Sequence, residues 1–183
     1  HEHPRAAGAG RVSAPASGAS GDPAVAVHSG RAIALIALAQ FFGTSLWFSA
    51  NGVADGLVRD WGISAGDIGL LTAAVQAGFI AGTLGVSLTG LADRFAASRL
   101  FVAGALLGAL CNALFAWWSH GLVSALPLRF LVGMSLACVY PIGMKLVVSW
   151  APDRAGGALA LLVGMLTLGT ALPHGMRAAG SAW

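Results

Sequence analysis

The chain has 183 residues, of which 57% are hydrophobic and 9% charged, and its mean hydropathy is +0.78. A soluble domain carries about 25% charged residues and could not bury this much apolar surface, so this composition excludes that class and indicates a protein whose main partner is the lipid bilayer. The formal net charge is +3, but the ten basic residues are scattered singly. Nucleic-acid binding needs a basic patch, so we expect no nucleic acid as a partner.

The first thirty residues differ from the rest of the chain. They are rich in Ala, Gly, Ser and Pro, have no hydrophobic period, and lack the apolar core of a signal peptide. We therefore predict a disordered cytoplasmic tail over residues 1–30. Because the chain begins with His1 and stops at Trp183 without a closing element, we also expect a fragment of a longer protein or the product of a truncated reading frame.

Five charge-poor windows follow the tail, and the remainder, residues 31–183, forms one predicted membrane domain. Each window holds roughly 20 residues, enough for a helix to cross about 30 Å of hydrocarbon. Lipid offers no partner to backbone amides, which forces helices, and the alternation of a β-barrel is absent. The predicted fold is all-α, a polytopic membrane bundle of about five spans, at residues 32–53, 68–89, 100–118, 127–150 and 157–176.

The positions of the basic residues predict the orientation. Arg31, Arg94, Arg99 and Arg154 fall before the first span or in alternate connections between spans. The positive-inside rule then places the N-terminus and the connections that hold Arg94 and Arg154 in the cytoplasm of a multi-pass cell (inner or plasma) membrane protein. Arg177 falls on the outer side and is an exception to this pattern.

Small residues recur at a spacing of four in several spans. Such spacing lets helix backbones approach closely, which is how helices associate in lipid. The alternative is chance, because the chain contains 26 glycines, and both interpretations stay open for any single pair. The candidate packing glycines are Gly78, Gly82, Gly104, Gly108, Gly133 and Gly164.

Between the second and third spans lies a short charged loop, TGLADRFAASRL, over residues 89–100. Asp93 could pair with Arg94 or Arg99 at the membrane face and hold one conformation closed. Alternatively, the loop is solvated and its arginines only set the topology.

This loop resembles motif A of the major facilitator superfamily of transporters, which runs glycine, any residue, leucine, small residue, aspartate, arginine, any residue, glycine. The residues from Leu91 to Arg94 match in order, Thr89 replaces the first glycine with Gly90 one place late, and Ala96 replaces the second glycine. The resemblance implies a gating role for Asp93 and Arg94.

The fourth span supports the same resemblance. Arg129 stands four residues before Gly133, as in motif B of the superfamily, whose arginine is linked to ion coupling. The following loop, residues 151–154, is similar to the proline-and-arginine loop that precedes the fifth helix. The similarity extends over about residues 31–177.

The resemblance implies most of the N-terminal half of a secondary transporter that works by alternating access, coupled to protons or another ion. The sixth span and the C-terminal half would be missing partners, so we expect this chain alone not to transport. The alternative is a non-transporting membrane remnant of a truncated gene.

Arg129 and Lys145 are the two bases inside a predicted span. They lie sixteen residues apart, about 24 Å along a straight helix and nearly on opposite faces. Arg129 shares its face with Gly133 and Tyr140, and Pro141 is expected to kink the helix. Intramembrane bases are rarely idle, so the pair favours a small anionic solute, although either side chain could instead snorkel to a surface.

Further coupling or substrate candidates are polar or aromatic residues in the apolar spans: Gln76, Asn51, Trp47 and Tyr140. For the polar ones the alternative is an interhelical hydrogen bond, worth about 0.6 kcal/mol.

A remote alternative is an intramembrane serine protease that uses Ser135 and His174. Leu136 follows Ser135 where the protease motif requires glycine, and His174 lies near the outer end of its span. Cys111 and Cys138 lack metal-ligand spacing. We therefore predict no enzyme activity, no cofactor and no metal site.

Overall fold

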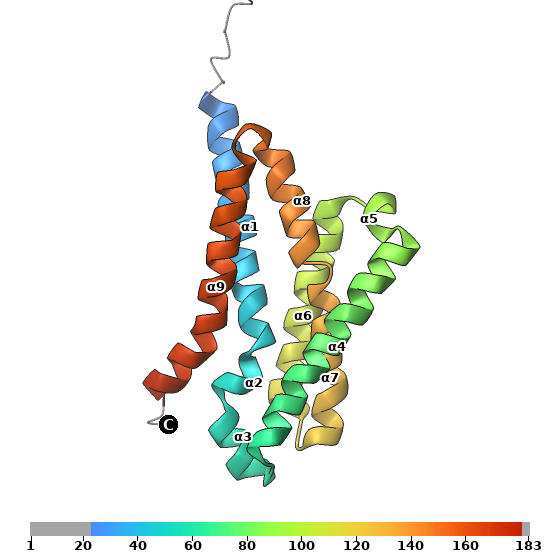
Figure 1. Cartoon of the computed structure of the whole chain (residues 1–183), viewed down its shortest axis with the longest axis vertical. Coiled ribbons are helices and arrows are strands. Elements are labelled where there is room, and N and C mark those ends of the chain that lie inside the picture. The colour runs from blue at the N-terminus through green and yellow to red at the C-terminus, as the bar shows by residue number, and fades with distance from the viewer. Residues whose placement is uncertain (1–22, 181–183) are drawn as a thin grey trace, which may run out of the picture.

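The computed structural model describes residues 23–180, in which every regular element is a helix (Figure 1). In chain order the elements are α1 (Pro23–Trp47), α2 (Ser49–Gly52), α3 (Ala54–Trp61), α4 (Ala65–Thr89), α5 (Leu91–Arg94), α6 (Ala97–Trp118), α7 (Leu122–Leu136), α8 (Tyr140–Trp150), the 3-10 turn η1 (Pro152–Arg154) and α9 (Ala155–Gly180).

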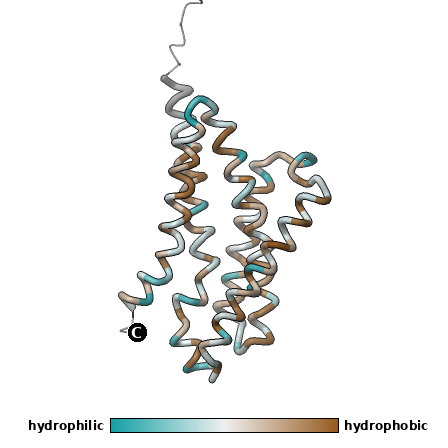
Figure 2. The backbone as a smooth tube through the Cα atoms, viewed as in Figure 1, coloured by the Kyte–Doolittle hydropathy of each residue, from teal (hydrophilic) through white to brown (hydrophobic). Residues whose placement is uncertain are grey.

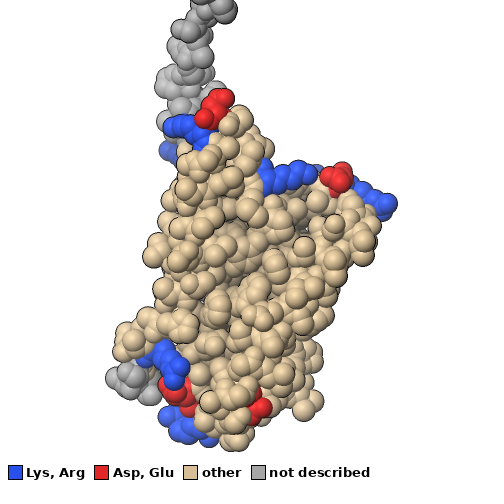
Figure 3. Space-filling model, in the orientation of Figure 1, with Lys and Arg blue, Asp and Glu red and all other residues tan. Residues whose placement is uncertain are grey.

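Within these residues, five helical segments are long and apolar enough to cross a membrane, which confirms the predicted all-α bundle. Apolar residues follow the spans, and polar residues gather at the turns (Figure 2). On the face seen in Figure 3, charged side chains lie at the two ends of the molecule and leave an uncharged band between them. The segments are His28–Trp47, Ala65–Thr89, Ala97–Trp118, Leu122–Trp150 and Pro152–Gly180.

The first span differs most from its prediction. The helix ends at Trp47 rather than at residue 53, the rest of the predicted span forms the short separate helix α2, and α3 forms where a loop was expected. At the other end, residues 23–30 were predicted to be disordered but form the first turns of α1. Proline is well tolerated at the first position of a helix, and Pro23 occupies it. The rest of the predicted tail, residues 1–22, lies outside the described residues.

Helix caps at both ends determine where α4 begins and ends. Ser64 and Asp67 form a capping box, in which the Ser64 amide donates to the Asp67 carboxylate at 2.8 Å and the Asp67 amide donates to Ser64 Oγ at 3.3 Å. The helix therefore starts three residues before the predicted span. It ends at Gly90, whose φ of 62° is left-handed and favours glycine, and the charged loop turns back from this point.

The bundle is organised around the tight packing of α4 on α7. A Cβ built on Gly78 would overlap the carbonyl group of Phe130, and one built on Gly133 would overlap the carbonyl group of Val75. Gly82, one turn further along α4, makes a third close contact with α7. The two backbones touch because glycine leaves no side chain between them, and dispersion contacts drive association in lipid.

The remaining predicted packing glycines behave in two ways. A Cβ on Gly104 would come within 2.8 Å of the Ser135 carbonyl oxygen, and one on Gly108 within 2.7 Å of Ser135 Oγ, so α6 also lies close to α7. A Cβ on Gly164 would meet nothing within 4 Å. The predicted close helix contact at Gly164 is therefore wrong within the described chain, because this residue of α9 faces away from the other helices.

The fourth span is broken between α7 and α8, as predicted from its proline. Pro141, the second residue of α8, has no amide to offer the Ala137 carbonyl, so the α-helical ladder cannot continue. The three residues between Leu136 and Tyr140 form a turn instead. The span has two differently directed halves, with Arg129 in the first and Lys145 in the second.

Candidate functional site

The break in the first span is where Arg129 binds. α1 stops at Trp47, so its last carbonyl oxygens lack helical donors. Arg129 supplies them: Nη1 donates to the Leu46 carbonyl at 3.0 Å, and Nη2 donates to the Trp47 carbonyl. Nη1 also donates to Ser49 Oγ at 2.8 Å and to Asn112 Oδ1 at 3.1 Å. One guanidinium thus joins α1, α2 and α6 to α7.

Arg129 is 0% exposed, so its side chain does not snorkel to the outer surface. None of the ion pairs found in residues 23–180 includes it. Its charge is instead balanced by the negative C-terminal end of α1 and by the face of the Phe115 ring, whose centroid lies 5.2 Å from Cζ. Its Nε is buried without an acceptor in the described chain. The site therefore holds a buried cation with dipoles around it and spare donor capacity.

An aromatic cluster lies next to this break. Trp47, Phe79 and Tyr140 contact one another, with ring centroids 5.2 to 6.2 Å apart. Tyr140 is buried, and its hydroxyl donates to Thr44 Oγ1 at 2.7 Å. Two of the candidates from the sequence, Trp47 and Tyr140, thus come together where α1, α4 and α8 meet.

The two polar candidates, Asn51 and Gln76, lie in different surroundings. Asn51 Oδ1 accepts a hydrogen bond from Thr72 Oγ1 at 3.1 Å, which ties α2 to α4 near the same break. Gln76 lies on α4 with an exposed side chain and does not join this group. Two other polar residues that the sequence marks inside the spans, Ser49 and Asn112, are the side-chain partners of Arg129. Their signal was that polar residues occur inside apolar spans, and they also bond to each other at 2.7 Å.

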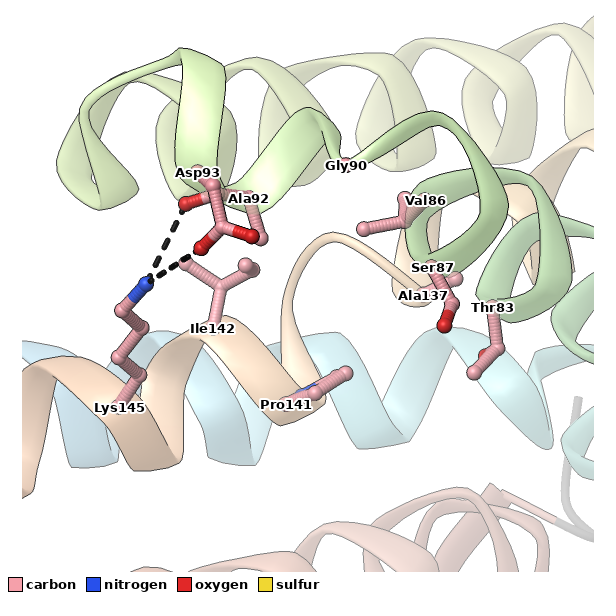
Figure 4. Close-up of a pocket in the computed structure, with 10 residues that line it drawn as sticks. All are labelled: Thr83, Val86, Ser87, Gly90, Ala92, Asp93, Ala137, Pro141, Ile142 and Lys145. Atoms are coloured by element: carbon pink, nitrogen blue, oxygen red, sulfur yellow. Dashed lines mark hydrogen bonds and ion pairs between the residues drawn. The ribbon is translucent and has the colours of Figure 1, made fainter.

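Lys145 belongs to a different site. Its Nζ donates to the Ala92 carbonyl at 3.3 Å and lies 3.8 Å from Asp93 Oδ1, so the side chain reaches from α8 to the charged loop (Figure 4). The two charged side chains are 55% and 87% exposed. Lys145 therefore snorkels to this surface and does not share a cavity with Arg129.

The charged loop covers a cavity of about 340 Å³ between α4, α5 and α8, lined by Thr83, Ser87 and Ile142 among others (Figure 4). Of the two interpretations of the loop, an ion pair of Asp93 with Arg94 or Arg99 is not found, since neither arginine takes part in an ion pair within residues 23–180. Both are exposed. Lys145 is close in space to Asp93 but 52 positions away, which hid this partner from local sequence patterns.

The residues proposed for a serine protease do not form a catalytic pair. Ser135 Oγ donates to the Val132 carbonyl at 2.6 Å, inside its own helix. The His174 ring packs on the Phe48 ring, with centroids 6.2 Å apart. Among the hydrogen bonds described for residues 23–180, none joins Ser135 to His174, so nothing in this geometry activates the serine as a nucleophile.

Comparison with known families distinguishes a transporter from an intramembrane protease. The profile described as Major Facilitator Superfamily matches residues 33–173, which is most of the chain. The chain belongs to the Major Facilitator Superfamily. The family is one of transporters, and the chain is not an enzyme.

Curated relatives of the chain are transporters. The niacin transporter NiaP of Acinetobacter baylyi is 32% identical over 108 residues, which cover 58% of this chain and 24% of that protein. The 4-hydroxybenzoate transporter PcaK of Pseudomonas aeruginosa is 32% identical over 102 residues, covering 56% and 22%. The putative metabolite transport protein YyaJ of Bacillus subtilis is 30% identical over 134 residues, covering 73% and 29%.

The chain thus spans less than a third of the length of each of these relatives. No solved structure gives a significant match to it.

Proposed function

We propose that the chain is the first five spans of a secondary active transporter that works by alternating access and carries a small anionic solute coupled to protons or another ion. Family membership and transporter relatives support the transport activity. In this proposal the sixth span and a C-terminal half complete the central cavity, and α1, α4 and α6 form one three-helix unit that packs against the incomplete second unit of α7 to α9.

The observation that carries the proposed solute class is the buried charge of Arg129. A cation in a low-dielectric site without a carboxylate beside it favours an anion as its partner. The solutes named for two relatives, niacin and 4-hydroxybenzoate, are both aromatic carboxylic acids. Lys145 no longer contributes to this proposal, because it lies against Asp93 and Ala92.

The Trp47, Phe79 and Tyr140 cluster supports an aromatic solute in particular. Aromatic rings pack edge to face with one another, and these three lie at the break that Arg129 holds. A carboxylate near Arg129 with its ring against this cluster would use both features. Arg129 would then be the residue whose hydrogen bonds respond to the solute or the coupling ion.

The orientation proposed for the chain follows from the charge of its two ends. Arg31, Arg94, Arg99, Lys145 and Arg154 lie at the end with the start of α1, the charged loop and η1 (Figure 1). We therefore place that end in the cytoplasm of a cell membrane. An impermeant maleimide applied to intact cells should label a single cysteine in α3 but not one in η1. The reverse pattern would contradict this orientation.

The function can be tested by uptake into vesicles that contain the complete transporter bearing this N-terminal half. With the outside more acidic than the lumen, we expect radiolabelled 4-hydroxybenzoate or niacin to accumulate, and a protonophore to abolish the accumulation. Choline, a cation, should not compete. Equal competition by choline, or accumulation by vesicles that contain only this 183-residue chain, would contradict the proposal.

A further inference from the structure

At the end of the molecule opposite the charged loop, Asp55 and Arg177 form a bidentate ion pair. Arg177 Nε donates to Asp55 Oδ2 at 2.8 Å and Nη2 donates to Oδ1 at 2.6 Å. The pair joins α3 to the last turn of α9, across 122 positions of sequence. It is the shortest ion pair in residues 23–180, and the fork of an arginine matches a carboxylate best in this geometry.

The short helix α2, which precedes α3, also touches α9. A Cβ built on Gly52 would lie 3.1 Å from the carbonyl oxygen and from Cβ of Pro173, and the Phe48 ring packs on His174. The chain between these contacts is interrupted on both sides of α2, at Phe48 and at Val53. Pro173 also removes one hydrogen bond from α9 before its final turns. The last turns of α9 therefore rest on α2, which Arg129 and α4 hold through Ser49 and Asn51.

These segments cover a cavity that leads toward Arg129. The cavity has a volume of about 500 Å³ and lies between α2, α3, α6 and α9. Its lining includes Ser49 and Asn112, the partners of Arg129, and also Ser119, whose Oγ is buried without a hydrogen-bond partner in the described chain. Most of the cavity lining is apolar, so the unpaired Ser119 hydroxyl is a position in it that offers water a hydrogen bond once water has access.

A second cavity, of about 440 Å³, lies nearer the surface and is lined by Asp55 and Arg177 themselves. It shares Gly52, Val53 and Met176 with the first cavity. The ion pair thus stands beside the path from the surface of this end to the hydrogen-bond partners of Arg129.

We propose that the Asp55–Arg177 pair is a latch on the end of the molecule that we place outside. When it separates, the last turns of α9 swing at Pro173 away from α2 and α3, and water reaches the buried Ser119 in the inner cavity. Partial exposure of the pair, with side chains 72% and 45% accessible, keeps the latch weak enough to open. The movement belongs to this chain alone, so its test does not depend on transport.

The latch can be tested by the reactivity of a cysteine in the inner cavity. The reporter is Ser119→Cys in the 183-residue chain with Cys111→Ala and Cys138→Ala, held in lipid nanodiscs, which expose both faces to a water-soluble maleimide. Asp55→Asn and Arg177→Gln should each raise the labelling rate about fivefold, and the exchanged pair Asp55→Arg with Arg177→Asp should restore the slow rate.

Two controls separate an open latch from a loosened fold. Arg59→Gln breaks the other ion pair of this end, between adjacent residues, and should leave the rate unchanged. A second reporter, Thr83→Cys in the cavity under the charged loop, should not respond to Asp55→Asn. Unchanged labelling of the Ser119→Cys reporter in both single variants would overturn the proposal, as would an equal acceleration at the Thr83→Cys reporter.

Discussion

Replacing Arg129 by leucine should destabilise the folded chain by about 3 kcal/mol, the cost of leaving the acceptors of a buried charged group unpaired. The Leu46 and Trp47 carbonyls would lose the guanidinium, and Ser49 and Asn112 would lose the group that joins them to α7. The removed desolvation cost of the charge offsets part of this loss. This gain is smaller than the loss of the hydrogen bonds. In an isolated span the arginine has already lost part of its hydration and keeps the rest by snorkelling, so folding adds only the remaining desolvation cost.

The measurement is the thermal unfolding of the chain in detergent, followed by tryptophan fluorescence. A loss of this size should lower the midpoint by roughly 5–10 °C. The unfolding midpoint of Arg129→Lys should fall between those of the parent chain and Arg129→Leu, because an ammonium group keeps the charge but cannot reproduce the fork that reaches two carbonyls. Lys145→Met, a base in the same span whose partner is exposed, is the matched control and should shift the midpoint by less than about 2 °C. Equal shifts for Arg129→Leu and Lys145→Met would contradict the buried network.

Substituting Gly133 by alanine should be nearly as damaging, although alanine is the better helix former by about 1 kcal/mol. The added methyl group would overlap the Val75 carbonyl and lie 2.7 Å from the Phe79 amide nitrogen. Backbone cannot move aside as a flexible side chain can, so α4 and α7 must separate, and we expect a net loss of about 2 kcal/mol. The unfolding midpoint of the variant in the same detergent measures this loss.

The matched control for this substitution is Gly164→Ala in α9. The new methyl group there meets nothing within 4 Å, so only the helix propensity changes, and the midpoint should stay the same or rise slightly. The two substitutions are chemically identical and opposite in expected sign. A fall at Gly164 as large as that at Gly133 would show that the close α4–α7 contact does not set the stability.

The spans could be predicted from the sequence because charge is expensive in lipid and therefore marks their ends. The charged loop and the arginine of the fourth span were recognisable by their residue order alone. The kink at Pro141 was also predictable, since it depends on the missing amide of one residue. Each of these inferences uses local information.

The remaining features depend on neighbours in space. The end of α1 at Trp47 is stabilised by Arg129 from 82 positions away, so the pattern of the first span predicted a longer helix. The spacing of small residues identified Gly78 and Gly133 as contact points but also selected Gly164, because that spacing cannot say which face of a helix meets another. Lys145 and Arg129 together were predicted to favour an anionic solute because both are bases in one span, although their spacing placed them on nearly opposite faces.

The most direct test of the proposed function is solute uptake by the complete transporter with Arg129→Gln, compared with the parent at equal abundance in vesicles. Glutamine keeps donors for the α1 carbonyls but removes the charge. We predict that proton-driven accumulation of 4-hydroxybenzoate or niacin falls at least about tenfold, because a buried cation that recognises a carboxylate contributes more than roughly 1.4 kcal/mol. Accumulation within twofold of the parent would contradict the assignment of Arg129 as the anion-recognising or coupling residue.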